Sequence, residues 1–114
     1  MNKILSLACL LLASNMAFSG VYNSNITGTI TSILSYPNGT VFILLDNQPS
    51  SHPKCDHNFF EISKDYDPKG ADRMYTRFLT SYAKGERVNI GYDNGSDSSS
   101  SCGPSGRIPI HRAG

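Results

Sequence analysis

Residue types that can act as a nucleophile, a base or a metal ligand crowd together in the stretch SHPKCDHNFF, residues 51–60. Two histidines, a cysteine and an aspartate lie there within six positions. Three chemistries fit this composition: a metal site, a catalytic thiol–imidazole pair, or one half of a disulfide with polar neighbours. The compartment and the remaining cysteines must decide between them.

The metal interpretation takes His52, Cys55 and His57 as ligands, with His111 as a further candidate. Zinc accepts such a set, but the H-x2-C-x-H spacing matches no standard finger or catalytic zinc pattern. A cysteine nucleophile needs a free thiolate beside a base. We predict no catalytic residue, no metal ligand and no cofactor, and keep both chemistries as alternatives.

The first residues have the pattern of a secretory signal peptide. Lys3 precedes the apolar run ILSLACLLLA, which is too short to span a bilayer. Small residues follow, so we predict a signal peptide over residues 1–19, cleaved after Ser19 or else after Gly20. Cys9 lies too early in the apolar run for a lipoprotein site. The chain is therefore expected to be periplasmic or secreted.

Residues 20–114 form one small domain on this interpretation. The whole chain has a formal net charge of +1, which argues against a strongly basic nucleic-acid-binding protein. No later segment is long and apolar enough to cross a membrane. We expect neither a nucleic-acid partner nor a membrane span.

Cys55 and Cys102 are the cysteines that remain after cleavage. An even pair in an oxidising compartment is most simply a disulfide, and this is the interpretation that we favour. It would join the loop before the third strand to the loop before the last strand. His52 and His57 then become solvated loop residues or hydrogen-bond partners that can also touch a ligand.

Period-two patterns and turn signals predict five strands, at residues 25–36, 40–46, 58–63, 87–92 and 107–112. The turn Pro37-Asn38-Gly39 joins the first two strands into a hairpin. In the second strand, one face starts with Val41 and the other with Phe42. Both faces carry apolar side chains, which is typical of a barrel strand buried on both sides. Pro109 should place the last strand at an edge or make it irregular.

One helix is predicted between residues 67 and 85, with Asp67 as the N-cap and Gly85 as the C-cap. It begins at Pro68 or nearer Ala71. Spacings of three and four define one apolar stripe, made of Ala71, Met74, Tyr75, Phe78, Leu79 and Tyr82. We expect this stripe to pack onto the strands.

The order β-β-β-α-β-β predicts a five-stranded OB-fold-like barrel with the helix closing one end. The alternative is an open α+β sheet with the helix across one face. OB barrels bind oligosaccharides around strands two and three. The weak candidate ligand contacts are accordingly Tyr36, Phe42, His52, His57, Phe59 and Tyr92.

The signal peptide, Cys55, the segment KGERVNI at residues 84–90 and the late Cys102-Gly103 together resemble small secreted proteins of Gram-negative bacteria. That group carries over no functional residues. More distantly, the layout is similar to the B subunits of subtilase-cytotoxin and pertussis-like pentameric toxins, which are exported OB-folds with a disulfide. That resemblance implies binding to cell-surface glycans and assembly into a ring.

From the sequence we therefore expect an exported, non-enzymatic binding module for a glycan or another envelope or host surface component. A periplasmic protein-interaction or inhibitor module is the first alternative, and a homo-oligomer is compatible with both. A small metal-dependent or hydrolytic enzyme built on the His/Cys/Asp cluster is the second alternative.

Overall fold

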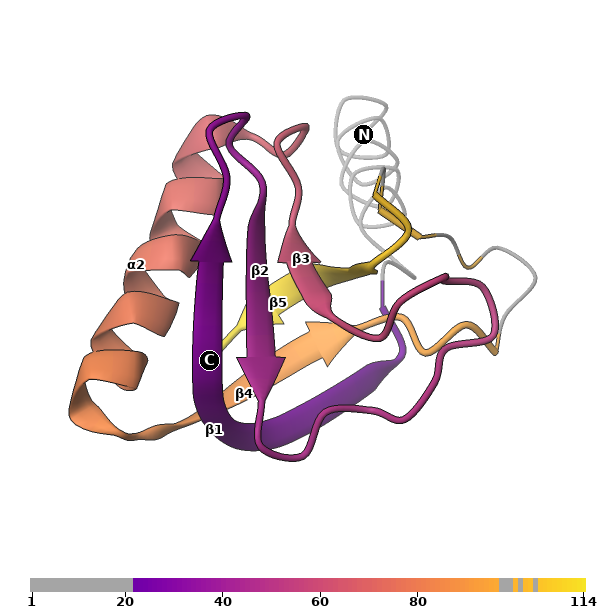
Figure 1. The fold of residues 1–114 in the computed structure, drawn as a ribbon, viewed down its shortest axis with the longest axis horizontal. Coiled ribbons are helices and arrows are strands. Elements are labelled where there is room, and N and C mark those ends of the chain that lie inside the picture. Colours follow the sequence, from indigo (N-terminus) through magenta and orange to yellow (C-terminus); the bar gives the residue numbers. More distant parts are fainter. Residues whose placement is uncertain (1–21, 97–99, 101, 104) are drawn as a thin grey trace, which may run out of the picture.

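A computed structural model describes residues 22–96, 100, 102, 103 and 105–114. The predicted signal peptide at residues 1–19 lies outside the described residues. Figure 1 shows the elements, which follow one another as β1 (Ser24–Ser35), β2 (Val41–Leu45), β3 (Phe60–Ile62), α2 (Pro68–Lys84), β4 (Arg87–Tyr92) and β5 (Ile108–Ala113). This is the predicted β-β-β-α-β-β order.

The strands close into a barrel in the order β1-β2-β3-β5-β4. All neighbours are antiparallel except β3 and β5, which run parallel. The predicted OB-fold-like barrel is confirmed, and the alternative of an open sheet is wrong. Within the part of the chain that the structure describes, no helix is long and apolar enough to cross a membrane.

The long strand β1 belongs to both halves of the barrel. Its first half pairs with β4, from Ser24 opposite Tyr92, and its second half pairs with β2, from Ile30 opposite Leu45. The register shifts between Ile30 and Ser32, and Figure 1 shows the strand curving strongly between its two halves. An irregularity of this kind bends a strand and raises its twist, which closure requires.

The core fills the inside of this barrel. On β2, Val41, Ile43 and Leu45 point inward, while Phe42 is on the opposite, outer face. Side chains alternate along a strand, so the two apolar faces predicted for β2 are confirmed. The inner set also includes Phe60 on β3, which is fully buried.

Helix α2 begins and ends where its capping residues predict. The carboxylate of Asp67 accepts a hydrogen bond from the Gly70 backbone N–H at 3.0 Å, and Pro68 is the first helical residue. Gly85 ends the helix with a left-handed φ of 68°. The helix contacts β1, β3, β4 and β5, so it covers several strands of the barrel rather than one sheet face.

The buried face of α2 differs from the predicted stripe. Phe78 is fully buried, and Met74 packs against the core as expected. Leu79 and Tyr82, however, are 41% and 46% exposed, while Ser81 is buried. The face that meets the barrel is therefore rotated toward Ser81, away from Leu79.

Strand β5 has neighbours on both sides, so the edge position expected from Pro109 is wrong. Pro109 lies opposite Glu61 in a short parallel ladder with β3. The alternative expectation was an irregular strand, and β5 is irregular close to Pro109. Tyr92 of β4 lies opposite Ile110 and Gly91 lies opposite Arg112, so one residue of β5 between them has no partner in the register.

Candidate functional site

Cys55 and Cys102 form the predicted disulfide, with an Sγ–Sγ distance of 2.03 Å and a Cα–Cα distance of 5.5 Å. It joins the loop before β3 to the loop before β5. A ligand atom of His52 lies within 4.8 Å of both sulfurs, so the three side chains do meet. The metal and nucleophile alternatives both need a cysteine thiolate, and neither sulfur can supply one while the two are bonded.

His52 is held inside the protein by both of its ring nitrogens. Nδ1 accepts a hydrogen bond from the Lys54 backbone N–H at 3.1 Å, so Nε2 carries the proton and donates to the Asp93 carbonyl at 2.7 Å. Gly95 has a φ of +81°, and a Cβ there would come within 2.7 Å of the imidazole. His52 is thus a buried hydrogen-bond partner rather than a solvated residue, whereas His57 is exposed.

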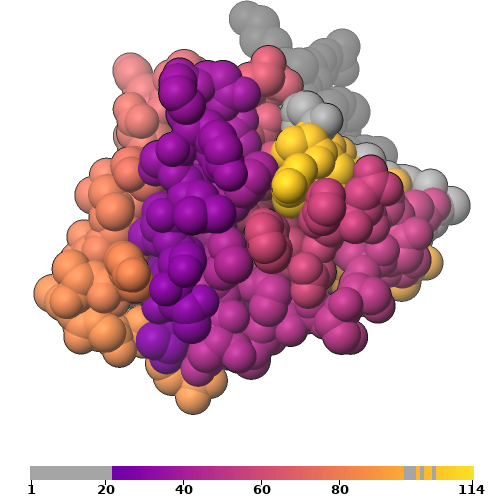
Figure 2. All heavy atoms as spheres, in the orientation of Figure 1, coloured from indigo at the N-terminus to yellow at the C-terminus, as the bar shows by residue number. Residues whose placement is uncertain are grey.

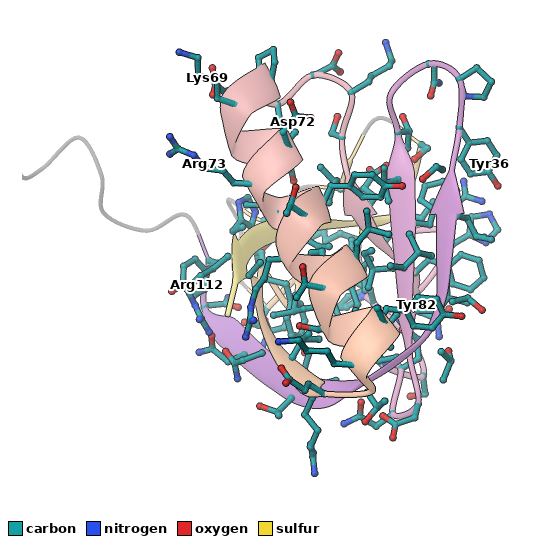
Figure 3. All side chains as sticks on the ribbon, turned by 90° about the vertical axis from the view of Figure 1, so that its left-hand side faces the viewer. Tyr36, Lys69, Asp72, Arg73, Tyr82 and Arg112 are labelled. Atoms are coloured by element: carbon teal, nitrogen blue, oxygen red, sulfur yellow. A yellow bond between two sulfur atoms is a disulfide. The ribbon has the colours of Figure 1, made fainter. Side chains whose placement is uncertain are left out.

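Three of the four predicted aromatic contacts form an aromatic row, defined as Tyr36, Phe42 and Phe59, on the outer face of β2 and β3. The ring centroids of Tyr36 and Phe42 are 5.1 Å apart, and those of Phe42 and Phe59 are 6.3 Å apart. Phe42 is buried, whereas Tyr36 is 47% exposed at one end of the row. Figure 3 shows Tyr36 projecting away from α2.

A cation and an aliphatic side chain border the aromatic row. The guanidinium carbon of Arg107 lies 4.6 Å from the Phe42 ring centroid, which is a cation–π contact. Leu34 lies opposite Phe42 in the β1–β2 register and is 39% exposed. Figure 2 shows the face of the molecule on which β1, β2 and the late segment before β5 come together.

Tyr92 is the predicted contact that does not join the aromatic row. Its ring meets Phe60 edge-on at a centroid distance of 5.1 Å, and it packs against the core. The aromatic row and Tyr92 are therefore on opposite sides of the barrel wall.

Glu61 is a buried carboxylate beside the aromatic row. It lies opposite Phe42 in the β2–β3 register and is 1% exposed. The Ser105 hydroxyl donates to Oε2 at 2.6 Å, while Oε1 has no hydrogen-bond partner among the described residues. A Cβ at position 103 would be 1.3 Å from Oε1, so only glycine fits at Gly103. Burial raises the pKa of Glu61, although Ser105 and Arg107 oppose the shift.

Tyr66 and Arg107 extend this polar cluster. The Tyr66 hydroxyl and the Arg107 Nε are buried and lack hydrogen-bond partners within the described part of the chain. Burial and the charge of Glu61 raise the pKa of Tyr66. Arg107 donates from Nη1 to the Ser105 carbonyl at 2.7 Å, which fixes the guanidinium over the row.

Sequence reasoning missed Glu61, Ser105 and Arg107. Glu61 shares the outward phase of its strand with Phe59, which placed it on the correct face but did not predict its burial. Glu61 is covered by Gly103, whose neighbour Cys102 is tied by the disulfide to the loop before β3. No local pattern carries that information.

His111, the further candidate metal ligand, lies on β5. It is half-buried, and its ring is stacked on Tyr22 at a centroid distance of 6.4 Å. Burial lowers the pKa of His111, and the nearby Asp93 carboxylate opposes that shift. This histidine does not belong to the group of possible metal ligands that the described residues contain, which is His52, Cys55 and Cys102.

The outer face of β2 and β3 presents aromatic rings and a guanidinium group side by side. Ring faces and guanidinium N–H groups suit a ligand with apolar faces and hydroxyl groups. Comparisons of the chain with protein-family models, curated proteins and solved structures found no significant match. A proposal on function therefore rests on the geometry of the site.

Proposed function

We propose that this protein is an exported, non-enzymatic binding module that takes a glycan, or another cell-surface component, on the outer face of β2 and β3. The observation that carries the proposal is the aromatic row with Arg107 fixed over Phe42. The disulfide supports export, because such bonds persist in oxidising compartments. Engagement of Cys55 in it supports a role without cysteine catalysis.

In this proposal Tyr36 contacts the sugar ring and Arg107 contacts its hydroxyl groups. The exposed ring of Tyr36 stacks on the apolar face of a sugar, and a tyrosine loses little side-chain entropy when it does so. Phe42 contacts that ring and is itself in contact with Phe59, while the outer N–H groups of the Arg107 guanidinium donate to hydroxyl oxygens. A surface already held in place reduces the ordering cost of binding.

A glycan array probed with residues 20–114 tests the proposal. We expect selective binding that Tyr36→Ala weakens about tenfold or more, equivalent to about 1.4 kcal/mol. Tyr82→Ala is the matched control, because Tyr82 is 46% exposed and Tyr36 is 47% exposed. No binding at high protein concentration, or equal losses in the two variants, would contradict a glycan site at the row.

A protein partner or a second copy of the chain is the other candidate, and the exposure of Leu34 beside the row favours it. Light scattering tests self-association. An oligomer would be expected to dissociate in Leu34→Asp but not in Leu79→Asp, since Leu79 has similar exposure on α2. A monomeric wild-type protein at high concentration would exclude the ring assembly.

A further inference from the structure

A groove runs between α2 and β5, away from the aromatic row. It consists of two hollows of about 300 and 280 Å³ that share Gly70, Met74 and His111. The larger hollow is lined by three arginines, Arg73 and Arg77 from α2 and Arg112 from β5. We call the two hollows together the arginine groove. Figure 3 shows Arg73 and Arg112 on the same side of α2.

The positive charge of the groove is not neutralised by ion pairs. Among the described residues the only salt bridge is between Lys64 and Asp65, so none of the three arginines is paired with a carboxylate. Arg112 is instead held by neutral groups. Its Nη2 donates to the side-chain oxygen of Asn25 at 2.6 Å and also to that of Asn89. The guanidinium is therefore positioned without losing its charge.

Acidic side chains lie at the margins of the arginine groove. Asp67 lines the smaller hollow, where its carboxylate already accepts from the Gly70 N–H. Asp72 lines a shallow surface of α2 together with Arg73 and Arg77, but it does not line either hollow of the groove. Asp93 interacts electrostatically with His111. The arginine end thus keeps an excess of positive charge.

The other end of the groove is mostly apolar. Besides the shared residues and Asp67, the smaller hollow is lined by Tyr66, Ala71 and Ile110. Gly70 keeps the passage between the two ends open, because it has no side chain and lines both hollows. A ligand that fills the groove would place a charged group among the arginines and an apolar body against these residues.

We propose that the arginine groove binds a small ligand in which an oxyanion, a carboxylate, sulfate or phosphate group, is attached to an apolar body. Arginine suits this role because its planar guanidinium donates two parallel hydrogen bonds to such a group. Figure 3 shows Tyr36 on the side of the molecule opposite Arg73 and Arg112, so this site is separate from the glycan surface. The proposal does not depend on the function of the aromatic row.

Phenyl phosphate is the probe, titrated into residues 20–114 at constant ionic strength and followed by NMR. We expect saturable shifts of the Gly70 amide and of the arginine Nε–H groups, with a dissociation constant of about 1 mM or lower. Arg73→Gln/Arg77→Gln should weaken binding about tenfold. Lys54→Gln/Lys84→Gln, which removes the same charge elsewhere, should leave it unchanged. Shifts that do not saturate, or equal losses in both double variants, would overturn the proposal.

The apolar half is tested by filling the groove at Gly70. A Cβ there would be 3.7 Å from its nearest neighbour, an oxygen of Asp67, so a larger residue fits without a clash. Wild type should bind phenyl phosphate more tightly than inorganic phosphate, and Gly70→Leu should abolish that preference. Benzoate and phenyl sulfate then show which oxyanion is favoured. Unchanged preference in a folded Gly70→Leu protein would refute an apolar subsite, and Tyr36→Ala should affect none of these titrations.

Discussion

The charge state of the Glu61 side chain affects the stability of the fold. The carboxylate is buried against Gly103, and the Ser105 hydroxyl satisfies one of its oxygens. Burial disfavours the charged form, and the guanidinium of Arg107 only partly offsets this cost. Ionisation of Glu61 should therefore weaken the fold.

We predict that Glu61→Gln flattens the pH dependence of stability. The folded-state pKa lies above the ordinary value of 4.5, so the folded protein retains a proton that the unfolded chain has lost. The stabilisation is fully present below about pH 4.5 and is lost as the pH rises through the folded pKa. Each unit by which the pKa is raised corresponds to about 1.4 kcal/mol.

Urea denaturation of wild type and Glu61→Gln between about pH 4 and pH 8 measures this difference. The other titrating groups are common to both proteins and cancel in the comparison. Wild type should lose more unfolding free energy than the variant as the pH rises. Parallel curves for the two proteins would show that the burial of Glu61 has no such cost.

Helix α2 shows how a correct periodicity can still give the wrong buried face. The predicted stripe was wider than the area that the barrel covers, and it was made of Ala71, Met74, Tyr75, Phe78, Leu79 and Tyr82. The barrel contacts only one side of that arc, which leaves Leu79 exposed. On the covered side it also buries Ser81, which is not part of the stripe. The sequence pattern predicts an apolar arc, but the curvature of the partner decides which part of it is covered.

We predict that Phe78→Ala lowers the free energy of unfolding by about 3–5 kcal/mol, because it leaves a cavity at a fully buried position. Leu79→Ala is the neighbouring control and should change it by no more than about 1 kcal/mol, since that side chain is 41% exposed. Urea denaturation of both variants tests this. Comparable losses would mean that Leu79 packs against the barrel after all.

At the level of the whole chain, the disulfide holds together the two long loops that precede β3 and β5. Cys55 and Cys102 are 47 residues apart, and the loop that they close contains β3, α2 and β4. Closing such a loop stabilises the fold by about 4 kcal/mol in the chain-entropy estimate. Small domains have total stabilities of about 5–15 kcal/mol, so this contribution is a large share.

Replacing both cysteines, as Cys55→Ser/Cys102→Ser, should lower the free energy of unfolding by up to about 4 kcal/mol. Residues 20–114 with the bond intact serve as the reference, and intact mass with and without reductant verifies the bond. Because the bond also brings Gly103 over Glu61, the double variant should reduce the effect of Glu61→Gln on the pH dependence. An unchanged urea midpoint would show that the barrel alone holds these loops.

The sequence by itself determined the order of the elements, both caps of α2, the cysteine pair and the OB-fold-like class. These features follow from local physical chemistry, namely alternation along strands, capping by Asp67 and Gly85, and turn residues. Tyr36, Phe42 and Phe59 were named from the sequence as weak candidate ligand contacts near strands two and three. The structure brings their rings together, and contact with a ligand stays a prediction.

Only the tertiary structure decided how distant segments cover one another. His52 is buried by the backbone at Asp93, and Glu61 is buried by Gly103, across 41 and 42 residues of sequence respectively. The arginine groove likewise requires α2 and β5 to lie side by side. Burial and electrostatic surroundings depend on which segments meet in three dimensions, and the separation of these residues along the chain does not specify that.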